Sequence, residues 1–101
     1  MKVEFLAEAE KELIDAIKFY NNESEGLGFE FAAEVSRTVL RIVEYPAAWT
    51  SISKRTRRCR TNRFPYGIIY QIREDMILVA AVMHLHRNPC SWRTRLPSSH
   101  R

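Results

Sequence analysis

Two histidines and an arginine stand close together at His84, His86 and Arg87, directly after the most apolar stretch of the chain. Near pH 7 histidine can accept or release a proton, and arginine can hold a phosphate. With Arg63 as a further cation, these residues are candidates for metal-independent RNA cleavage, with one group deprotonating the 2′-oxygen and another protonating the leaving oxygen. The alternative, a hydrogen-bonded structural histidine at a strand end, stays open for both histidines.

A second candidate is the basic run from Lys54 to Arg63, with six bases in ten residues and no acid. On a strand, Arg58 and Arg60 would share one face. Nucleic-acid-binding proteins use such rows to neutralise phosphates, although a basic strand can also simply face solvent. The arginines expected to contact a target or nucleic acid are Arg58, Arg60, Arg63, Arg87 and Arg95.

The charges of the chain are strongly segregated. Residues 1–45 carry ten acids and five bases, a net charge of −5, whereas residues 46–101 carry two acids and eleven bases, a net charge of +9. Twelve of the sixteen bases are arginine, whose planar fork of donors suits phosphate and carboxylate. This pattern predicts an anionic partner, either nucleic acid or an acidic protein segment.

Other kinds of site are not indicated. Cys59 and Cys90 cannot form a disulfide framework, and the histidines, including His100, lack neighbours at metal-ligand spacing. There is no phosphate-cradling glycine loop, Rossmann fingerprint or Ser-His-Asp spacing, so no metal and no cofactor are expected. Trp92 can fill the end of the core with Arg93 or Arg95 stacked on it, or it can stack a base, and core packing is favoured.

The elements that position these residues begin with two helices. Apolar residues at helical spacing predict a first helix over about 7–22 and a second over about 28–45, stopped by Pro46. The second helix carries an additional apolar strip well away from its main one. This strip either packs on the rest of the fold or is exposed and binds a partner. Its residues are Phe29, Ala33 and Leu40.

Strands account for the rest of the chain, and the expected ranges are 2–5, 49–53, 57–62, 64–73 and 76–85. The last range is apolar without a break from Met76 to Met83, as in a central strand buried on both faces. A short helical turn and a frayed tail over 97–101 follow. The order β-α-α-β-β-β-β predicts a single α+β domain over 1–101, a helical hairpin packed on a mostly antiparallel sheet. The residues expected to be buried include Phe64, Tyr70, Val79, Ala81 and Trp92.

No apolar run is long enough to span a membrane, and the N-terminus has no apolar secretion signal, so a cytoplasmic location is expected.

Over roughly residues 2–95, the chain resembles the RelE/ParE superfamily of toxins of type II toxin–antitoxin systems, often labelled plasmid-stabilisation proteins. The most specific carriers are Arg63-Phe64-Pro65-Tyr66, Ile69-Tyr70 and Ala81-Val82-x-His84-x-x-Arg87-x-Pro89-x-x-Trp92-x-x-Arg95. The resemblance implies a cognate antitoxin that wraps the toxin and neutralises it. An acidic, amphipathic antitoxin segment would cover Phe29, Ala33 and Leu40 and pair with the arginine-rich face, giving a hetero-oligomer.

The resemblance also implies a target, and here the superfamily divides. ParE-like members poison DNA gyrase without catalytic residues, whereas RelE-like members cut mRNA on the ribosome with a tyrosine near the C-terminus. In that region this chain offers Trp92, whose indole exchanges no proton near pH 7. The ParE-like activity is therefore favoured. The alternatives are an mRNA endonuclease, kept open by His84 and His86, and a non-catalytic nucleic-acid-binding or degenerate antitoxin-binding module.

Overall fold

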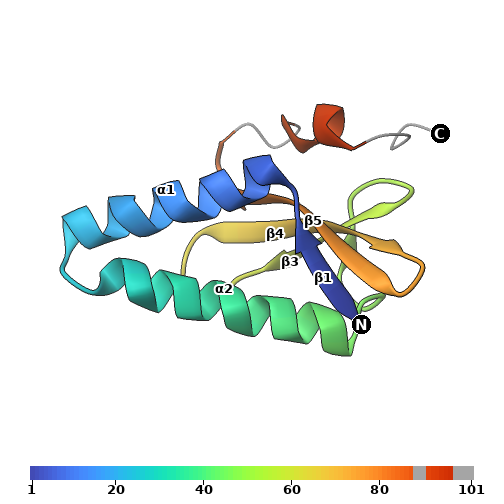
Figure 1. Cartoon of the computed structure of the whole chain (residues 1–101), viewed down its shortest axis with the longest axis horizontal. Coiled ribbons are helices and arrows are strands. Elements are labelled where there is room, and N and C mark those ends of the chain that lie inside the picture. The colour runs from blue at the N-terminus through green and yellow to red at the C-terminus, as the bar shows by residue number, and fades with distance from the viewer. Residues whose placement is uncertain (88–90, 97–101) are drawn as a thin grey trace.

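The computed structural model describes residues 1–87 and 91–96 (Figure 1). Its elements are β1 (Lys2–Phe5), α1 (Ala7–Glu23), α2 (Leu27–Glu44), β2 (Thr50–Ser51), β3 (Thr56–Arg60), β4 (Tyr66–Arg73), β5 (Met76–His84) and the short 3-10 helix η1 (Ser91–Arg95). The predicted order is confirmed, and both predicted α-helices end within one residue of their predicted bounds. Asn88, Pro89, Cys90 and the expected tail with His100 lie outside the described residues.

The two helices form a tight antiparallel hairpin because a glycine lies where they touch. A Cβ atom at Gly28 would lie 2.1 Å from the carbonyl oxygen of Ile17 on α1, which no side chain allows. The Gly28 amide instead donates a hydrogen bond to Asn21 Oδ1 at 2.7 Å. The turn itself uses Gly26, whose φ of 84° is a conformation that favours glycine.

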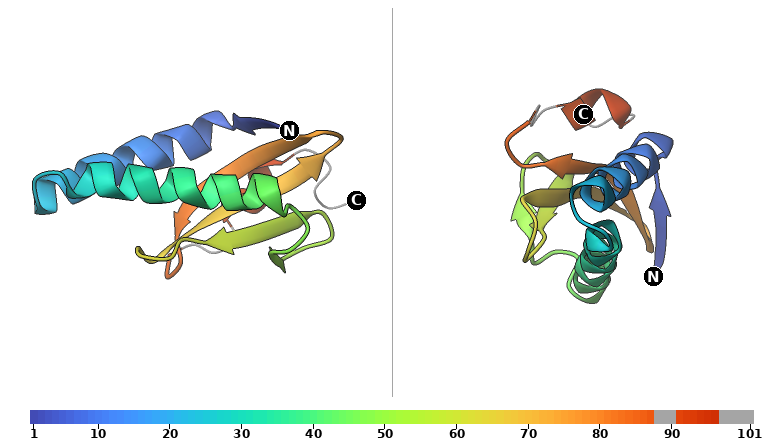
Figure 2. Two further views of the ribbon diagram at one scale, coloured as in Figure 1. Left: turned by 90° about the horizontal axis from the view of Figure 1, so that it is seen from below. Right: turned by 90° about the vertical axis from the view of Figure 1, so that its left-hand side faces the viewer.

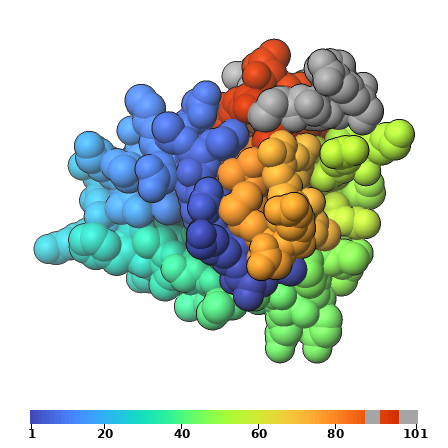
Figure 3. Space-filling model, turned by 45° about the vertical axis from the view of Figure 1, so that its right-hand side comes forward, coloured from blue at the N-terminus to red at the C-terminus, as the bar shows by residue number. Residues whose placement is uncertain are grey.

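The strands form one sheet in the order β1-β5-β4-β3-β2. Every pair is antiparallel except β1 and β5, which run parallel from Lys2 beside Met76 to Phe5 beside Val79. Figure 3 shows the residues of β1 beside those of β5 at the surface. The sheet is therefore mixed, and the predicted mostly antiparallel sheet is confirmed.

The sheet separates two apolar clusters. One face packs against the helical hairpin, and its buried residues include Phe31 of α2 and Tyr70 of β4. The other face packs against Trp92 and Leu96, so that η1 lies across β5 from the helices (Figure 2). Strand β5 contributes to both clusters, which confirms that it is buried on both faces.

Several sequence-based expectations need correction. Strand β5 ends at His84 rather than at Leu85, β3 ends at Arg60 rather than at Asn62, and β2 is only two residues long. Phe64 precedes β4 and is only partly buried, unlike the fully buried Tyr70.

A bulge interrupts the β4–β5 ladder, because Ile69 faces Ala81 while the next residue, Tyr70, faces Val79. As a result Ala80 and Ala81 both join the cluster around Trp92, where their small side chains leave room for the indole.

Strand β1 pairs with only the first part of β5. Beyond the end of β1, an ion pair takes the place of a neighbouring strand along the edge of β5. Glu12 of α1 accepts hydrogen bonds from Arg95 at 2.8 and 2.9 Å and from the backbone amide of Val82 at 3.0 Å. Arg95 also donates to the carbonyl of Ala80 at 3.1 Å. The hydrogen bonds to Glu12 raise the pKa of Arg95. This Glu12–Arg95 clasp thus satisfies backbone groups that a longer β1 would otherwise bind, and it ties η1 to α1.

We expect the clasp to contribute strongly to stability. Replacing Arg95 with Met should lower the free energy of unfolding by about 2–3 kcal/mol, because the partly buried Glu12 carboxylate loses its charged partner. Urea denaturation of both proteins measures the difference. Lys11→Met is the matched control, since it breaks the exposed Lys11–Asp15 pair on the same helix and should leave stability nearly unchanged. Equal effects of the two substitutions would contradict the assigned role of the clasp.

Candidate functional site

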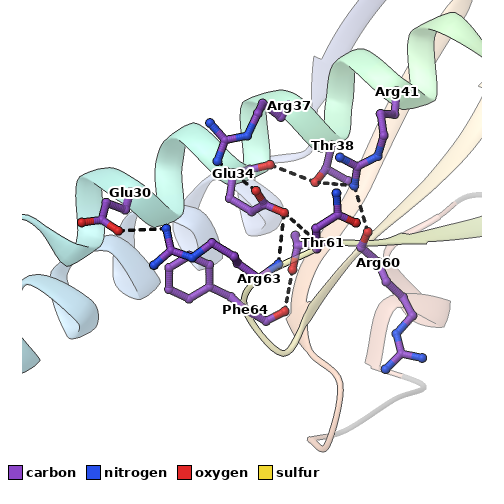
Figure 4. Close-up of polar contacts among 10 residues, drawn as sticks. Glu30, Glu34, Arg37, Thr38, Arg41, Arg60, Thr61, Arg63 and Phe64 are labelled. Carbon is purple, nitrogen blue, oxygen red and sulfur yellow. Dashed lines mark hydrogen bonds and ion pairs between the residues drawn. The ribbon is translucent and has the colours of Figure 1, made fainter.

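A buried carboxylate of α2 binds the backbone of the loop after β3 (Figure 4). Glu34 is only 2% exposed, and it accepts hydrogen bonds from the backbone amides of Asn62 and Arg63. Arg37 donates a further bond at 2.9 Å. Burial by itself raises the pKa of Glu34, but the bonds from Asn62, Arg37 and Arg63 outweigh it, so the pKa lies below its ordinary value. Glu34 is therefore an ionised anchor for this loop.

Neighbouring contacts extend this anchor along α2. Arg41 donates to Thr38 Oγ1 at 3.2 Å and to the carbonyl of Arg60 at 3.1 Å. At the far side of the loop, Arg63 pairs with Glu30 at 2.9 Å and lies 5.1 Å from the ring centroid of Phe64 (Figure 4). The side chain of Arg63 thus forms an ion pair with the helical hairpin.

The open cationic surface lies on β3. Cys59 and Thr61 face the interior, while Arg60 is exposed and Arg58 half-buried on the opposite face, as the alternation predicts. Among the described residues, no carboxylate forms an ion pair with Arg58 or Arg60. Arg57, which points the other way, donates to the carbonyl of Trp49 at 2.8 Å. Contact of Arg58 and Arg60 with a target stays a prediction, but their charges are available for it.

Arg95 is placed differently from the expectation. Its guanidinium is bound by Glu12 inside the fold, and its side chain is only 15% exposed. The reason is that Trp92 of η1 and the following Leu96 pack on the sheet and bring Arg95 over the edge of β5. The structure therefore gives Arg95 an internal partner rather than an open position on the cationic surface.

The two histidines lie at the end of β5. Their ring centroids are 5.6 Å apart, and His84 also packs edge-on against Tyr66 at 5.3 Å. His84 and Arg87 line a hollow of about 470 Å³ between α1 and β5, together with Tyr20 and Tyr66. Neither His86 nor Arg63 lines this hollow. The structure thus brings His84, His86 and Arg87 close together, but only His84 and Arg87 of the four residues predicted for RNA cleavage line this hollow.

The hydrogen bonding of His84 limits the chemistry it can perform. Its Nδ1 accepts a bond from the backbone amide of His86 at 3.2 Å. Burial, with the charges of Arg87 and His86, lowers the pKa of His84, so the ring is neutral at pH 7. A neutral ring with an accepting Nδ1 carries its proton on Nε2. His84 is accordingly a hydrogen-bond donor toward its surroundings, and its only lone pair is already engaged.

Trp92 is a core residue, as the sequence analysis favours. It is 2% exposed, and the guanidinium of Arg93 lies 4.8 Å from its ring centroid.

Cys59 is a buried thiol whose pKa is raised by burial. Within residues 1–87 and 91–96, no group of three potential metal ligands occurs, and none of the helices has the length and apolar character needed to span a bilayer.

The apolar strip on α2 is exposed rather than packed on the fold. Phe29 is 69% and Leu40 67% exposed, and Ala33 between them is exposed as well. These residues follow one another at intervals of four and seven, so they form one line on the outer side of the helix. Of the two interpretations of this strip, the structure supports the exposed one.

Sequence reasoning did not identify Glu12 and Glu34. Each occupies a helical position between buried residues: Glu12 between Ala9 and Ala16, and Glu34 next to Val35. An acid on the apolar face of a helix was the available signal, because buried carboxylates require partners and the second half of the chain is rich in arginine.

Comparison with known proteins gives two findings. Residues 3–89 match the family model described as ParE toxin of type II toxin–antitoxin system, parDE. A chain of the solved structure "Chromosomal ParDE TA system from P. aeruginosa" superimposes with a TM-score of 0.75 at 13% identity, covering 85% of this chain and 97% of that one. At that identity the structural likeness shows the fold. No match was found among curated proteins.

We expect Glu34 to make stability depend on pH. Its folded pKa lies below the ordinary value of 4.5, so its stabilisation is complete above pH 4.5 and declines as the pH falls through the folded pKa. Glu34→Gln should lower the free energy of unfolding by about 2–3 kcal/mol at pH 7. The difference from the natural protein should shrink below pH 4.5.

Thermal unfolding at pH 7 and at pH 3.5 measures this effect. Glu30→Gln, which breaks an exposed ion pair on the same helix, is the control and should change stability little at either pH. A Glu34→Gln deficit of the same size at both pH values would show that the carboxylate charge is not what anchors the loop.

Proposed function

Because the chain belongs to the family of ParE toxins of type II toxin–antitoxin systems, we propose that it arrests growth by poisoning DNA gyrase in the cytoplasm, and that a cognate antitoxin neutralises it. The observation that supports a non-catalytic mode of action is the state of His84. His84 is a neutral donor whose lone pair is occupied, and the four candidates for RNA cleavage do not share one hollow. The cationic surface of β3 is then a contact surface for the target, with Arg58 and Arg60 as its centre.

The exposed strip on α2 supports the antitoxin half of the proposal. Two large apolar side chains, Phe29 and Leu40, point outward on a helix whose opposite side is fully packed. An amphipathic segment would bury them, and acidic residues of the same segment could reach the unpaired arginines of β3. The antitoxin would therefore cover an apolar line and a cationic surface at once, which also blocks the target.

We expect His86→Ala to keep its toxicity. A gyrase poison needs no proton transfer from His86, so expression without antitoxin should arrest growth as in the natural protein and double-strand DNA breaks should accumulate. The purified protein should stabilise cleaved DNA in a gyrase assay.

The opposite result has a clear meaning. If His86→Ala or Arg87→Ala abolishes toxicity at an unchanged melting temperature, and the natural toxin leaves cut mRNA on ribosomes, the protein is an endonuclease. If the natural protein accumulates harmlessly in several bacterial hosts, the toxin is degenerate.

Antitoxin binding should depend on the α2 strip. We expect Phe29→Asp combined with Leu40→Asp to weaken antitoxin affinity at least about 100-fold, because two apolar side chains lose their burial and two charges are introduced. Both positions are exposed, so toxicity and the melting temperature should be retained, and neutralisation on co-expression should fail.

Ile72→Asp provides the control, since Ile72 is an exposed apolar residue of β4 outside the helical pair. It should leave the affinity for antitoxin unchanged. Normal neutralisation of the α2 double variant would exclude the strip as the antitoxin site.

A further inference from the structure

A second hollow, of about 210 Å³, lies on the face of the sheet that carries η1. All three long strands and η1 contribute to it: Arg58 from β3, Ile69 from β4, Met83 from β5, and Trp92 and Arg93 from η1. The antitoxin strip on α2 belongs to the other side of the molecule, where the helices pack on the opposite face of the sheet. This hollow is therefore separate from the α2 strip, although its Arg58 is one of the β3 arginines that acidic residues of the antitoxin are proposed to reach.

Arg58, which lines this hollow, carries an unsatisfied donor. Its Nε is buried, and among the described residues no atom accepts a hydrogen bond from it. Its aliphatic stem lies over Gly67 of β4, where a Cβ atom would come within 3.1 Å of both Cγ and Cδ. Buried donors in native proteins nearly always have an acceptor, so this donor indicates an acceptor that the described protein does not itself provide.

The surroundings of Arg58 strengthen its attraction for an anion. Ile69, Met83 and Trp92 are buried apolar walls, and a charge beside such walls acts through a lower effective dielectric. Arg93, stacked on the indole of Trp92, places a second guanidinium at the same hollow. Two cations, His84 and apolar walls form a small anion site, and no acid among the described residues lines it.

We propose that this hollow binds a phosphate group of a single-stranded nucleic acid, with Arg58 Nε as the anchoring donor. Guanidinium groups match phosphate oxygens in geometry and charge. Two residues further along β3, Arg60 is exposed on the same face, so the cations continue from the hollow onto the open surface. Such a row fits successive phosphates of one strand better than a single carboxylate.

The size of the hollow sets the extent of the contact. At about 210 Å³ it is smaller than the roughly 300–1,000 Å³ of sites for drug-sized ligands. It can take one phosphate with part of its nucleotide, while neighbouring phosphates lie along β3. This binding goes beyond the proposed action on gyrase and involves no cleavage, so it can be measured on the purified chain whether or not that chain is toxic.

The test is a titration of the full chain, followed by NMR of the arginine Nε–H and tryptophan indole resonances. The probes are a four-nucleotide single-stranded DNA, the RNA of the same sequence, and inorganic phosphate. We expect saturable binding of both oligonucleotides with a shift of the Arg58 Nε–H resonance, and weaker binding of inorganic phosphate that competes with them. A preference between DNA and RNA identifies the source of the phosphate.

The variants separate the hollow from general charge attraction. Arg58→Gln should raise the Kd for the oligonucleotide at least about tenfold, and Arg58→Lys nearly as much, because lysine keeps the charge but lacks the Nε donor. Arg55→Gln removes the same charge from the turn before β3, outside the hollow, and should change the Kd less than about twofold.

Gly67→Ala keeps every charge but crowds the stem of Arg58, and it should also weaken binding. Circular dichroism verifies that each variant is folded. If Arg58 variants misfold, the Arg58 resonance and Gly67→Ala still decide the question.

Four results would overturn the proposal. These are equal losses in Arg55→Gln and Arg58→Gln, full affinity in Arg58→Lys, no saturable binding of any probe, or stronger binding of a tetraglutamate peptide at the same resonances. The last result would assign the hollow to a carboxylate of a protein partner.

Discussion

The fold depends on two carboxylates that the helices direct inward to the basic half of the chain. Glu12 of α1 holds Arg95 and the edge of β5, and Glu34 of α2 holds the loop after β3. Glu34 is almost completely buried and Glu12 is partly buried, so their charges must be compensated by hydrogen bonds and cations. An acidic helical half and an arginine-rich sheet half therefore do more than carry opposite charges, because two specific contacts fasten one to the other.

These contacts divide the arginines into two groups. Arg37, Arg63 and Arg95 pair with acids of the helices, whereas Arg58 and Arg60 lie on the opposite face of the sheet, beyond the reach of those acids. An arginine held by a carboxylate orders the protein's own backbone, and one without an acidic partner retains its charge for another molecule. The net charge of the second half thus overstates the positive charge available to a target. The charges of Arg58 and Arg60 remain available.

Local patterns predicted the elements well, because helical spacing and the apolar run of β5 reflect burial directly. The partners of the charged residues were not predictable in the same way. Glu12 reaches Val82 and Arg95, 70 and 83 residues further along, and no local spacing encodes such contacts. The end of β5 was misjudged for a related reason, since the backbone turns after His84, whose carbonyl accepts a hydrogen bond from the amide of Arg87, and periodicity does not reveal this turn. Arg95 was expected to contact a target because a sequence motif gives the identity of a residue but not its burial or its partners.

The clasp also connects the two faces of the sheet. Glu12 belongs to the helical side, but through Arg95 it holds η1, and η1 supplies the indole and the guanidinium that wall the smaller hollow. Arg95 lies only two residues from Arg93 and three from Trp92, so its position constrains theirs. If the pair between Glu12 and Arg95 is broken, η1 keeps its apolar contacts with the sheet but loses its attachment to α1. The geometry of the cationic hollow is therefore set partly by an acid on the other side of the sheet, and stability and anion binding at this position share one interaction.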